Sequence, residues 1–99
     1  MALAENTYDD PFRLAGNRGE CAARLLDPKL GMALEVRAAP AFRSLVVYAP
    51  EGRNVVALEP YTCAPDAFNL AARGVDGGAI ELSPGARFEA SYEIRLSAL

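Results

Sequence analysis

Apolar and polar residues alternate most clearly over residues 87–96, near the end of the chain. A period of two sustained over ten residues is typical of a β-strand and does not fit a helix. The pattern therefore predicts a strand over Arg87–Leu96 with a polar face and an apolar face. We expect the apolar face to pack in the core; it carries Phe88, Ala90, Tyr92, Ile94 and Leu96.

Shorter runs of strand type precede this one. The alternating runs 20–27, in which Cys21, Ala23 and Leu25 share a face, and 32–38 flank Asp27-Pro28-Lys29-Leu30-Gly31 and predict a hairpin. The dense apolar run Ser44–Ala49 predicts a strand covered on both faces. Further short runs lie at 12–14, 55–59 and 79–82, with a tight turn predicted at 83–85. Six or seven strands separated by Pro and Gly turns indicate an all-β fold, an antiparallel β-sandwich forming a single domain over residues 1–99.

Three segments do not fit the strand pattern. Residues 1–11 are polar and end in Asp9-Asp10-Pro11, which predicts a lead-in loop, and Gly16-Asn17-Arg18-Gly19 predicts a break. Residues 60–78 form the longest irregular region. Within it, Asp66–Arg73 predicts a short helix with Asp66 as N-cap and Gly74 as C-terminal stop.

Composition and charge exclude several classes of partner. The 99 residues are 52% hydrophobic and 23% charged, as in a globular domain. The 10 basic and 13 acidic residues are interspersed, so we expect neither a nucleic-acid-binding face nor a polybasic membrane patch. No stretch approaches the roughly 18 apolar residues that span a bilayer. The start of the chain does not resemble a signal peptide, so a cytoplasmic location is expected.

Two cysteines and the absence of histidine limit the chemistry. Cys21 and Cys63 are expected to be reduced thiols, and two thiols without histidine argue against a metal site. Nothing in the sequence indicates a cofactor. A Ser-His-Asp or Cys-His system cannot be formed by this chain alone. Acid-base chemistry must use carboxylates, Tyr, Lys or Cys, or a residue from another chain.

The carboxylate best placed for such chemistry is Glu59, where the predicted strand 55–59 reaches a Glu-Pro pair and gives way to the irregular region. A strand fixes the position of a carboxylate there, while the loop leaves the space in front of it open. From the residues alone, the ordinary interpretation is an exposed carboxylate at a strand end.

Three segments of the chain are similar to parts of one enzyme family. The first is 59–69, EPYTCAPDAFN, in which a Glu is followed by a loop reading Pro-Asp-Ala-x-Asn. The second is the strand and turn before it at 45–52, LVVYAPEG. The third is the closing turn and last strand at 82–96, LSPGARFEASYEIRL. Together they resemble the aldose 1-epimerase (mutarotase) family, whose fold is a large β-sandwich. YDDPF at 8–12 resembles, less specifically, the Asp-x-x-Phe that opens the last third of such enzymes. The chain thus looks like the C-terminal third of a galactose mutarotase-like supersandwich.

The resemblance implies an enzyme that interconverts the α and β anomers of a hexose. It assigns the catalytic base to Glu59, and it makes Tyr61, Asp66 and Asn69 candidate substrate-binding residues. Each has a simpler interpretation as well: packing for Tyr61, a turn or cap for Asp66, and a loop-fixing hydrogen bond for Asn69. Cys63, in the same segment, is expected to be a small buried filler.

Two departures from the family restrict what can be transferred. The Glu-Pro-x-Thr spacing looks more like an uncharacterised sugar-epimerase-like branch, so the sugar is left open. The family's acid histidine lies upstream, and this chain has no histidine. We therefore expect little activity from the chain alone, and self-association or a missing N-terminal part of the sandwich. The alternatives are a non-catalytic carbohydrate-binding or interaction module and a sandwich domain from a larger polysaccharide-active enzyme.

Overall fold

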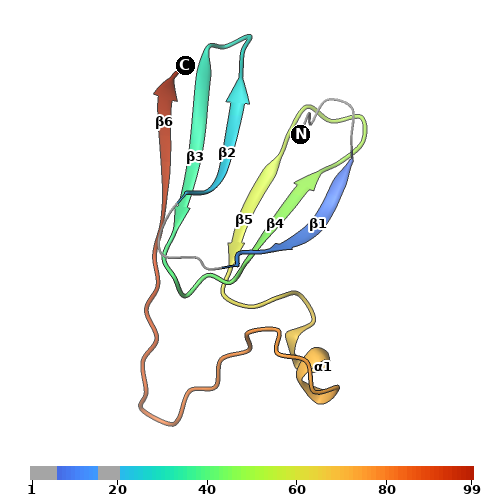
Figure 1. Ribbon diagram of the computed structural model, residues 1–99, viewed down its shortest axis with the longest axis vertical. Helices are drawn as coiled ribbons and strands as arrows, with labels where there is room; N and C mark the ends of the chain where they lie inside the picture. Colours follow the sequence, from blue (N-terminus) through green and yellow to red (C-terminus); the bar gives the residue numbers. More distant parts are fainter. Residues whose placement is uncertain (1–6, 16–20) are drawn as a thin grey trace.

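The computed structural model describes residues 7–15 and 21–99. In chain order its elements are β1 (Tyr8–Arg13), β2 (Cys21–Asp27), β3 (Met32–Ala38), β4 (Ser44–Ala49), β5 (Ala57–Tyr61), α1 (Ala67–Ala72) and β6 (Tyr92–Ala98). The strands form two three-stranded antiparallel sheets, with the orders β1-β4-β5 and β2-β3-β6 (Figure 1). The all-β fold predicted from the alternating pattern is confirmed.

The core lies on the middle strand of each sheet. Both β3 and β4 have the bounds that the sequence predicts. On β4, every residue except Tyr48 is buried, which confirms the prediction of a strand covered on both faces. On β3, Ala33, Val36 and Ala38 are at most 2% exposed. Each of these strands also has a hydrogen-bonded neighbour on both sides, which covers its two edges.

The hairpin between β2 and β3 forms at the predicted turn. The Asp27 carboxylate accepts hydrogen bonds from the backbone N–H groups of Lys29, at 3.0 Å, and Leu30, at 3.1 Å. Gly31 has a φ of +66°, which favours glycine. The side chain of Asp27 thus fixes the turn that sets the register of both strands.

A β-bulge on β2 corrects one prediction about its faces. Cys21 lies opposite Arg37, whereas Ala23 lies opposite Val36, so the register shifts between the two β2 residues. Neighbouring residues on β3 point to opposite faces. Cys21 therefore does not share a face with Ala23, as the uninterrupted pattern predicted, because the bulge adds one residue to β2.

The outer strands of the sheet β1-β4-β5 each continue through a proline. Tyr8–Pro11, predicted as part of a lead-in loop, instead belongs to β1, and β5 runs through Pro60 to Tyr61 rather than ending at Glu59. Both strands pair only with β4 among the described strands. Proline is tolerated at such positions because an outer strand has one side without ladder hydrogen bonds. The predicted break at 16–19 lies outside the described residues.

Residues after α1 differ most from the sequence prediction. No strand forms over the predicted segment 79–82, and the last strand begins at Tyr92 rather than at Arg87. The turn at 83–85 is confirmed by a 2.9 Å hydrogen bond from the Ala86 N–H to the Ser83 carbonyl. In Figure 1 this segment runs below the sheets as an extended trace before it returns to β3.

The apolar face of the last strand is not buried, so its predicted place in the core is wrong. Phe88, Tyr92, Ile94 and Leu96 are 41%, 54%, 58% and 65% exposed. The register puts Tyr92, Ile94 and Leu96 opposite Ala38, Val36 and Leu34 of β3. Alternation does predict which side chains share a face. The Phe42 ring packs edge-to-face on the Tyr92 ring at this face, with centroids 5.9 Å apart, but Ile94 and Leu96 stay more than half exposed.

The shape of the chain agrees with this exposed face. Its radius of gyration is 15.5 Å and its extents are 49 × 26 × 22 Å, whereas a compact domain of this length has a radius of about 13 Å. The accessible surface is 7372 Å², compared with about 5,400 Å² for a folded monomer of this mass. The extensive contacts between described strands lie within each sheet. The closed sandwich stays a prediction for an assembled molecule.

Candidate functional site

Glu59 lies on β5, opposite Val46 of β4, and is half-buried. Tyr61 follows two residues later, opposite Ser44, so it projects from the same face of the strand. The position of Glu59 is therefore set by the pairing with β4, the best-buried strand of the molecule. The prediction that a strand holds this carboxylate is confirmed, although the strand extends two residues beyond it.

The Glu59 carboxylate has no ionic or hydrogen-bonding partner among the side chains of residues 7–15 and 21–99. The carboxylate oxygens of Glu59 are therefore not engaged by another described side chain.

Asp66 and Asn69 form a separate pair at the start of α1. The Asn69 Nδ2 group donates a hydrogen bond of 2.6 Å to the Asp66 carboxylate. Asp66 occupies the N-cap position in the left-handed region, with φ 63°, but its side chain makes no capping hydrogen bond. The predicted place of Asp66 is right and the predicted capping bond is wrong, because the carboxylate is held by Asn69 instead.

The four predicted site residues thus fall into two groups. Glu59 and Tyr61 share a face of β5, and Asp66 and Asn69 are bonded to each other in the following loop. No hydrogen bond joins the two groups in the part of the chain that the structure describes. The loop between them, rather than direct contact, determines how they lie.

That loop is fastened to the sheet by a residue pair that sequence analysis missed. The Arg43 guanidinium, just before β4, donates two hydrogen bonds to the Asp76 carboxylate, at 3.2 and 3.1 Å. The backbone N–H of Arg43 also donates to the Tyr61 carbonyl at 3.0 Å. We call the ion pair Arg43–Asp76 the loop clamp. It ties the end of the irregular region to the segment just before β4, which is itself bonded to Tyr61 at the end of β5.

Backbone contacts complete the clamp. The Gly78 N–H donates to the Asp76 carboxylate at 2.9 Å, and the Ala64 N–H donates to the Gly77 carbonyl at 2.7 Å. The two ends of the loop that contains α1 are therefore bonded to each other. Gly78 has a φ of +88°, and a Cβ atom there would lie 3.2 Å from Cδ and from Nη1 of Arg43. Only glycine fits the clamp at this position without displacement.

Charge in the clamp shifts the pKa of both partners. The hydrogen bonds from Arg43, followed by that from the Gly78 N–H, lower the pKa of Asp76 below its ordinary value, and the charge of Arg13 adds to this effect. The same contact raises the pKa of Arg43. Both groups are solvent-exposed, so the pair acts as a positional restraint on the loop more than as a source of stability.

The sequence indicates a turn at the clamp but not the ion pair. Asp76 precedes two glycines, a pattern that is typical of a turn. Its partner lies 33 residues earlier, and no local period or spacing connects residues so far apart. The pairing of β4 with β5 places Arg43 beside Tyr61, and the bond between Ala64 and Gly77 brings Asp76 back to the same end of the sheet.

The thiols and acidic groups do not form a metal site in the described residues. Cys21 is exposed and Cys63 is half-buried, and both are free thiols. Cys63 is therefore less buried than predicted. Across the described ranges, no three His, Cys, Asp or Glu side chains are grouped so as to hold a metal ion. The helix that they contain, α1, has six residues and is too short to cross a membrane.

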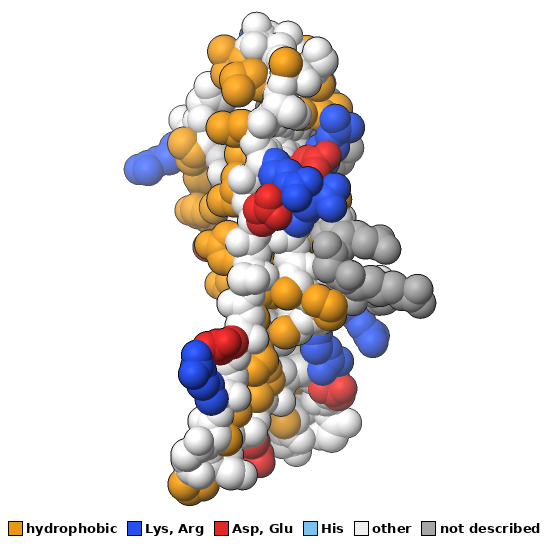
Figure 2. Space-filling view, turned by 90° about the vertical axis from the view of Figure 1, so that its left-hand side faces the viewer, with side chains coloured by type: hydrophobic (Ala, Val, Ile, Leu, Met, Phe, Trp, Pro, Cys, Tyr) orange, Lys and Arg blue, Asp and Glu red, His pale blue; other side chains and the backbone are white. Residues whose placement is uncertain are grey.

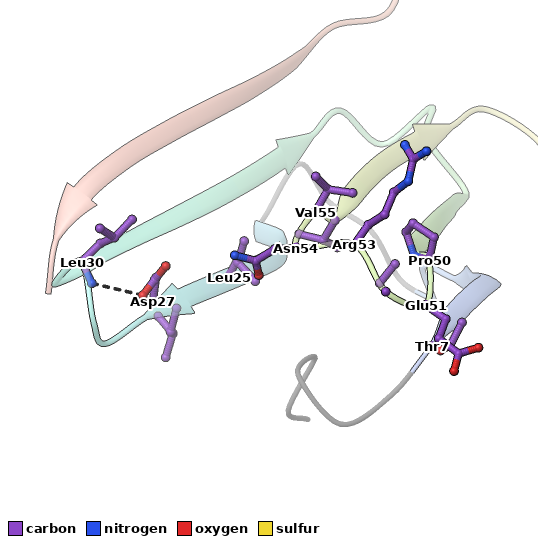
Figure 3. Close-up of a pocket in the computed structure, with 13 residues that line it drawn as sticks. Thr7, Leu25, Asp27, Leu30, Pro50, Glu51, Arg53, Asn54 and Val55 are labelled. Carbon is purple, nitrogen blue, oxygen red and sulfur yellow. Dashed lines mark hydrogen bonds between the residues drawn. The ribbon is translucent and has the colours of Figure 1, made fainter.

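A groove of about 900 Å³ opens at the other end of the sheets (Figure 3). It lies between the hairpin turn of β2 and β3 and the turn from β4 to β5, and Leu25, Leu30 and Val55 contribute apolar side chains to it. The Asp27 carboxylate lies at the edge of the groove, where it accepts a hydrogen bond from the backbone N–H of Leu30 in the hairpin turn. None of the four predicted site residues lines this groove.

Comparison of the chain with protein-family models, with curated proteins and with solved structures gives no match.

Proposed function

We propose that the chain is part of an aldose 1-epimerase-like enzyme in which Glu59 is the general base acting on a hexose. The observation that carries this proposal is the half-buried Glu59 carboxylate, fixed by β4 and free of ion pairs within the described residues. A general base needs a fixed position and an available lone pair. The resemblance of residues 59–69 to the family's catalytic segment supplies the reaction.

In the proposed reaction, Glu59 takes the proton from the anomeric hydroxyl group of the sugar while an acid protonates the ring oxygen. The bond between C1 and the ring oxygen breaks, and the hydroxyl oxygen becomes the carbonyl oxygen of the open-chain aldehyde. Rotation about the C1–C2 bond exposes the other face of the carbonyl. On reclosure the C5 hydroxyl oxygen attacks C1 and returns its proton to the acid, while Glu59 returns its proton to the carbonyl oxygen, which yields the other anomer.

The sequence contains no histidine, so the histidine that acts as the acid in the resembled family would have to be supplied from outside this chain. A missing acid-base partner lowers the rate by about 10²- to 10⁴-fold. We therefore propose that the chain alone has weak activity, and that the complete site forms against another part of a larger sandwich.

The remaining candidates would bind rather than react. Tyr61, on the same face as Glu59 and 38% exposed, offers an aromatic surface to a sugar ring. Asp66 and Asn69 hold each other, yet each retains an oxygen able to accept a hydrogen bond from a sugar hydroxyl group. Their first role is to shape the loop.

Chemical rescue tests the base assignment. Mutarotation of freshly dissolved α-glucose and α-galactose is followed by polarimetry with the chain, in the presence and absence of imidazole, which can serve as the missing acid. We expect a protein-dependent rate that rises with imidazole in the wild type and in Glu51→Gln, an exposed-carboxylate control, but not in Glu59→Gln. Equal rescue of Glu59→Gln would show that Glu59 is not the base.

A second candidate function is a non-catalytic carbohydrate-binding or interaction module. The exposed apolar face of β6 favours it, because such a face needs a partner. Sugar binding that is detected by NMR and unaffected by Glu59→Gln, together with no imidazole-dependent rate, would favour this module over the enzyme. In either case we propose a cytoplasmic location, supported by the two free thiols.

A further inference from the structure

The outer strand β6 has the features of an edge that pairs with another strand. All seven of its residues are exposed, and among the described strands it is hydrogen-bonded only to β3. It is regular over its whole length, whereas the opposite edge of the same sheet, β2, contains a bulge. A regular, uncovered edge exposes backbone N–H and C=O groups that a further strand can satisfy. Figure 2 faces this edge and shows apolar and charged side chains gathered on different sides of its upper part.

Charges on the polar face of this sheet alternate from strand to strand. Arg24 of β2 lies opposite Glu35 of β3, and Glu35 lies opposite Arg95 of β6. In the neighbouring row, Arg37 lies opposite Glu93. The Arg95 guanidinium also bonds the Glu93 carboxylate of its own chain at 2.7 Å. The next strand beyond β6 would continue both rows if it offered an acid opposite Arg95 and a base opposite Glu93.

A second copy of β6 offers those two charges in one antiparallel register. We propose that two copies of this chain pair through β6, with Ile94 opposite Ile94 of the second copy. In that register Glu93 faces Arg95 of the second copy, and Arg95 faces its Glu93. Tyr92 and Leu96 face each other across the junction on the apolar side. The two sheets become one six-stranded sheet with a continuous apolar face.

Neighbouring registers are unfavourable for reasons of charge. Centring the pairing on Arg95 would place two arginines directly opposite each other, and centring it on Glu93 would do the same with two glutamates. A shift by one residue would set the apolar face of one strand against the polar face of the other. Like charges directly opposite each other destabilise a strand pair, so the register centred on Ile94 is selected. This proposal does not depend on Glu59.

Charge reversal at the junction tests both the interface and its register. Sedimentation equilibrium of the full chain is expected to show a dimer, and Arg95→Glu or Glu93→Lys alone should raise its Kd by about 10- to 100-fold. An equimolar mixture of these two variants should dimerise about as well as the wild type. In the mixed pair, the introduced lysine faces the introduced glutamate and the native Arg95 faces the native Glu93.

A matched control separates the interface from effects within one chain. Arg24→Glu also sets a second acid opposite Glu35, and the Arg24 and Arg95 side chains are both 53% exposed, but Arg24 lies at the far edge of the sheet. We expect this variant to dimerise like the wild type. A wild type that stays monomeric would mean that something other than a second copy covers β6. That result, or a mixture no tighter than its separate variants, would overturn the proposal.

Discussion

Replacement of Gly78 by alanine tests the loop clamp directly, because the added methyl group would lie against the Arg43 side chain. The added Cβ would lie 3.2 Å from Cδ and Nη1 of Arg43 and 3.3 Å from the Thr62 carbonyl oxygen. Gly52 is the matched control. It has a similar φ, +73° compared with +88°, but apart from its chain neighbours no described residue has an atom within 4 Å of its Cβ position.

Two contributions to the loss of stability can then be separated. A side chain in the left-handed region costs about 1–2 kcal/mol, and both variants carry that cost. Gly78→Ala must also displace Arg43 or the Thr62 backbone, and overpacking of this kind costs about 1–3 kcal/mol more. We therefore expect Gly78→Ala to lose about 2–5 kcal/mol of local stability and Gly52→Ala about 1–2 kcal/mol.

Two assays measure this difference. Urea unfolding gives the free energy of unfolding of the whole chain, and trypsin cleavage after the exposed Arg73 reports opening of the loop. A loss of 2 kcal/mol raises the open population, and with it the cleavage rate, by about 30-fold. If both variants leave cleavage at Arg73 equally slow, or lose equal stability in urea, the clamp does not hold the loop as described.

Three other outcomes are expected. Asp76→Asn should accelerate tryptic cleavage of the loop at neutral pH. Because folding lowers the pKa of Asp76, its contribution to loop stability is present above the unfolded pKa of about 4 and is lost as the pH falls through the folded pKa. The loop stabilities of wild type and variant should therefore converge in acid. A difference in stability that stays constant with pH would contradict the assigned ion pair. Val36→Ala removes part of a side chain that is 2% exposed and should lower the free energy of unfolding by about 1–3 kcal/mol. Ile94→Ala, at a side chain that is 58% exposed, should lower it by clearly less in the monomer. Equal losses in urea titrations would place Ile94 in the core. A thiol reagent should modify exposed Cys21 before half-buried Cys63 without denaturant, and the reverse order would be inconsistent with the described burial.

Strand bounds were predictable where local pattern and burial agree. Met32–Ala38 and Ser44–Ala49 were predicted to the residue, because Gly31 and Pro50 each mark one end and both strands lie in the middle of a sheet. The outer strands were harder to predict. Pro11 and Pro60 look like strand breakers in sequence, yet an outer strand tolerates proline because one of its sides makes no ladder bonds.

The failure at residues 87–96 has a different cause. Alternation reports which side chains share a face, but whether that face is covered depends on another layer. Tyr92, Ile94 and Leu96 satisfy the pattern fully and remain exposed. The bulge at Cys21 shows the same limit on a smaller scale, since one extra residue changes the face without changing the composition.

The local features of the candidate site were predictable from the sequence, whereas its tertiary contact was not. The strand position of Glu59 follows from its apolar neighbours, and the turn at Asp66 follows from residue types that favour turns. Arg43 and Asp76 could not be paired in advance, since their contact depends on tertiary geometry. The bond between Asp66 and Asn69, three residues apart, is local. It was anticipated as a loop-fixing hydrogen bond of Asn69, one of two interpretations of that residue.

The prolines in β1 and β5 determine how far assembly through strand pairing can proceed. Each removes a backbone donor from an outer strand of the sheet β1-β4-β5, and the bulge disturbs the outer strand β2 of the other sheet. Among the described strands, each chain is therefore effectively monovalent for edge pairing, through β6. Monovalent units related by a two-fold axis stop at two copies. An exposed apolar strand that could otherwise seed open-ended polymerisation is in this way confined to a finite complex.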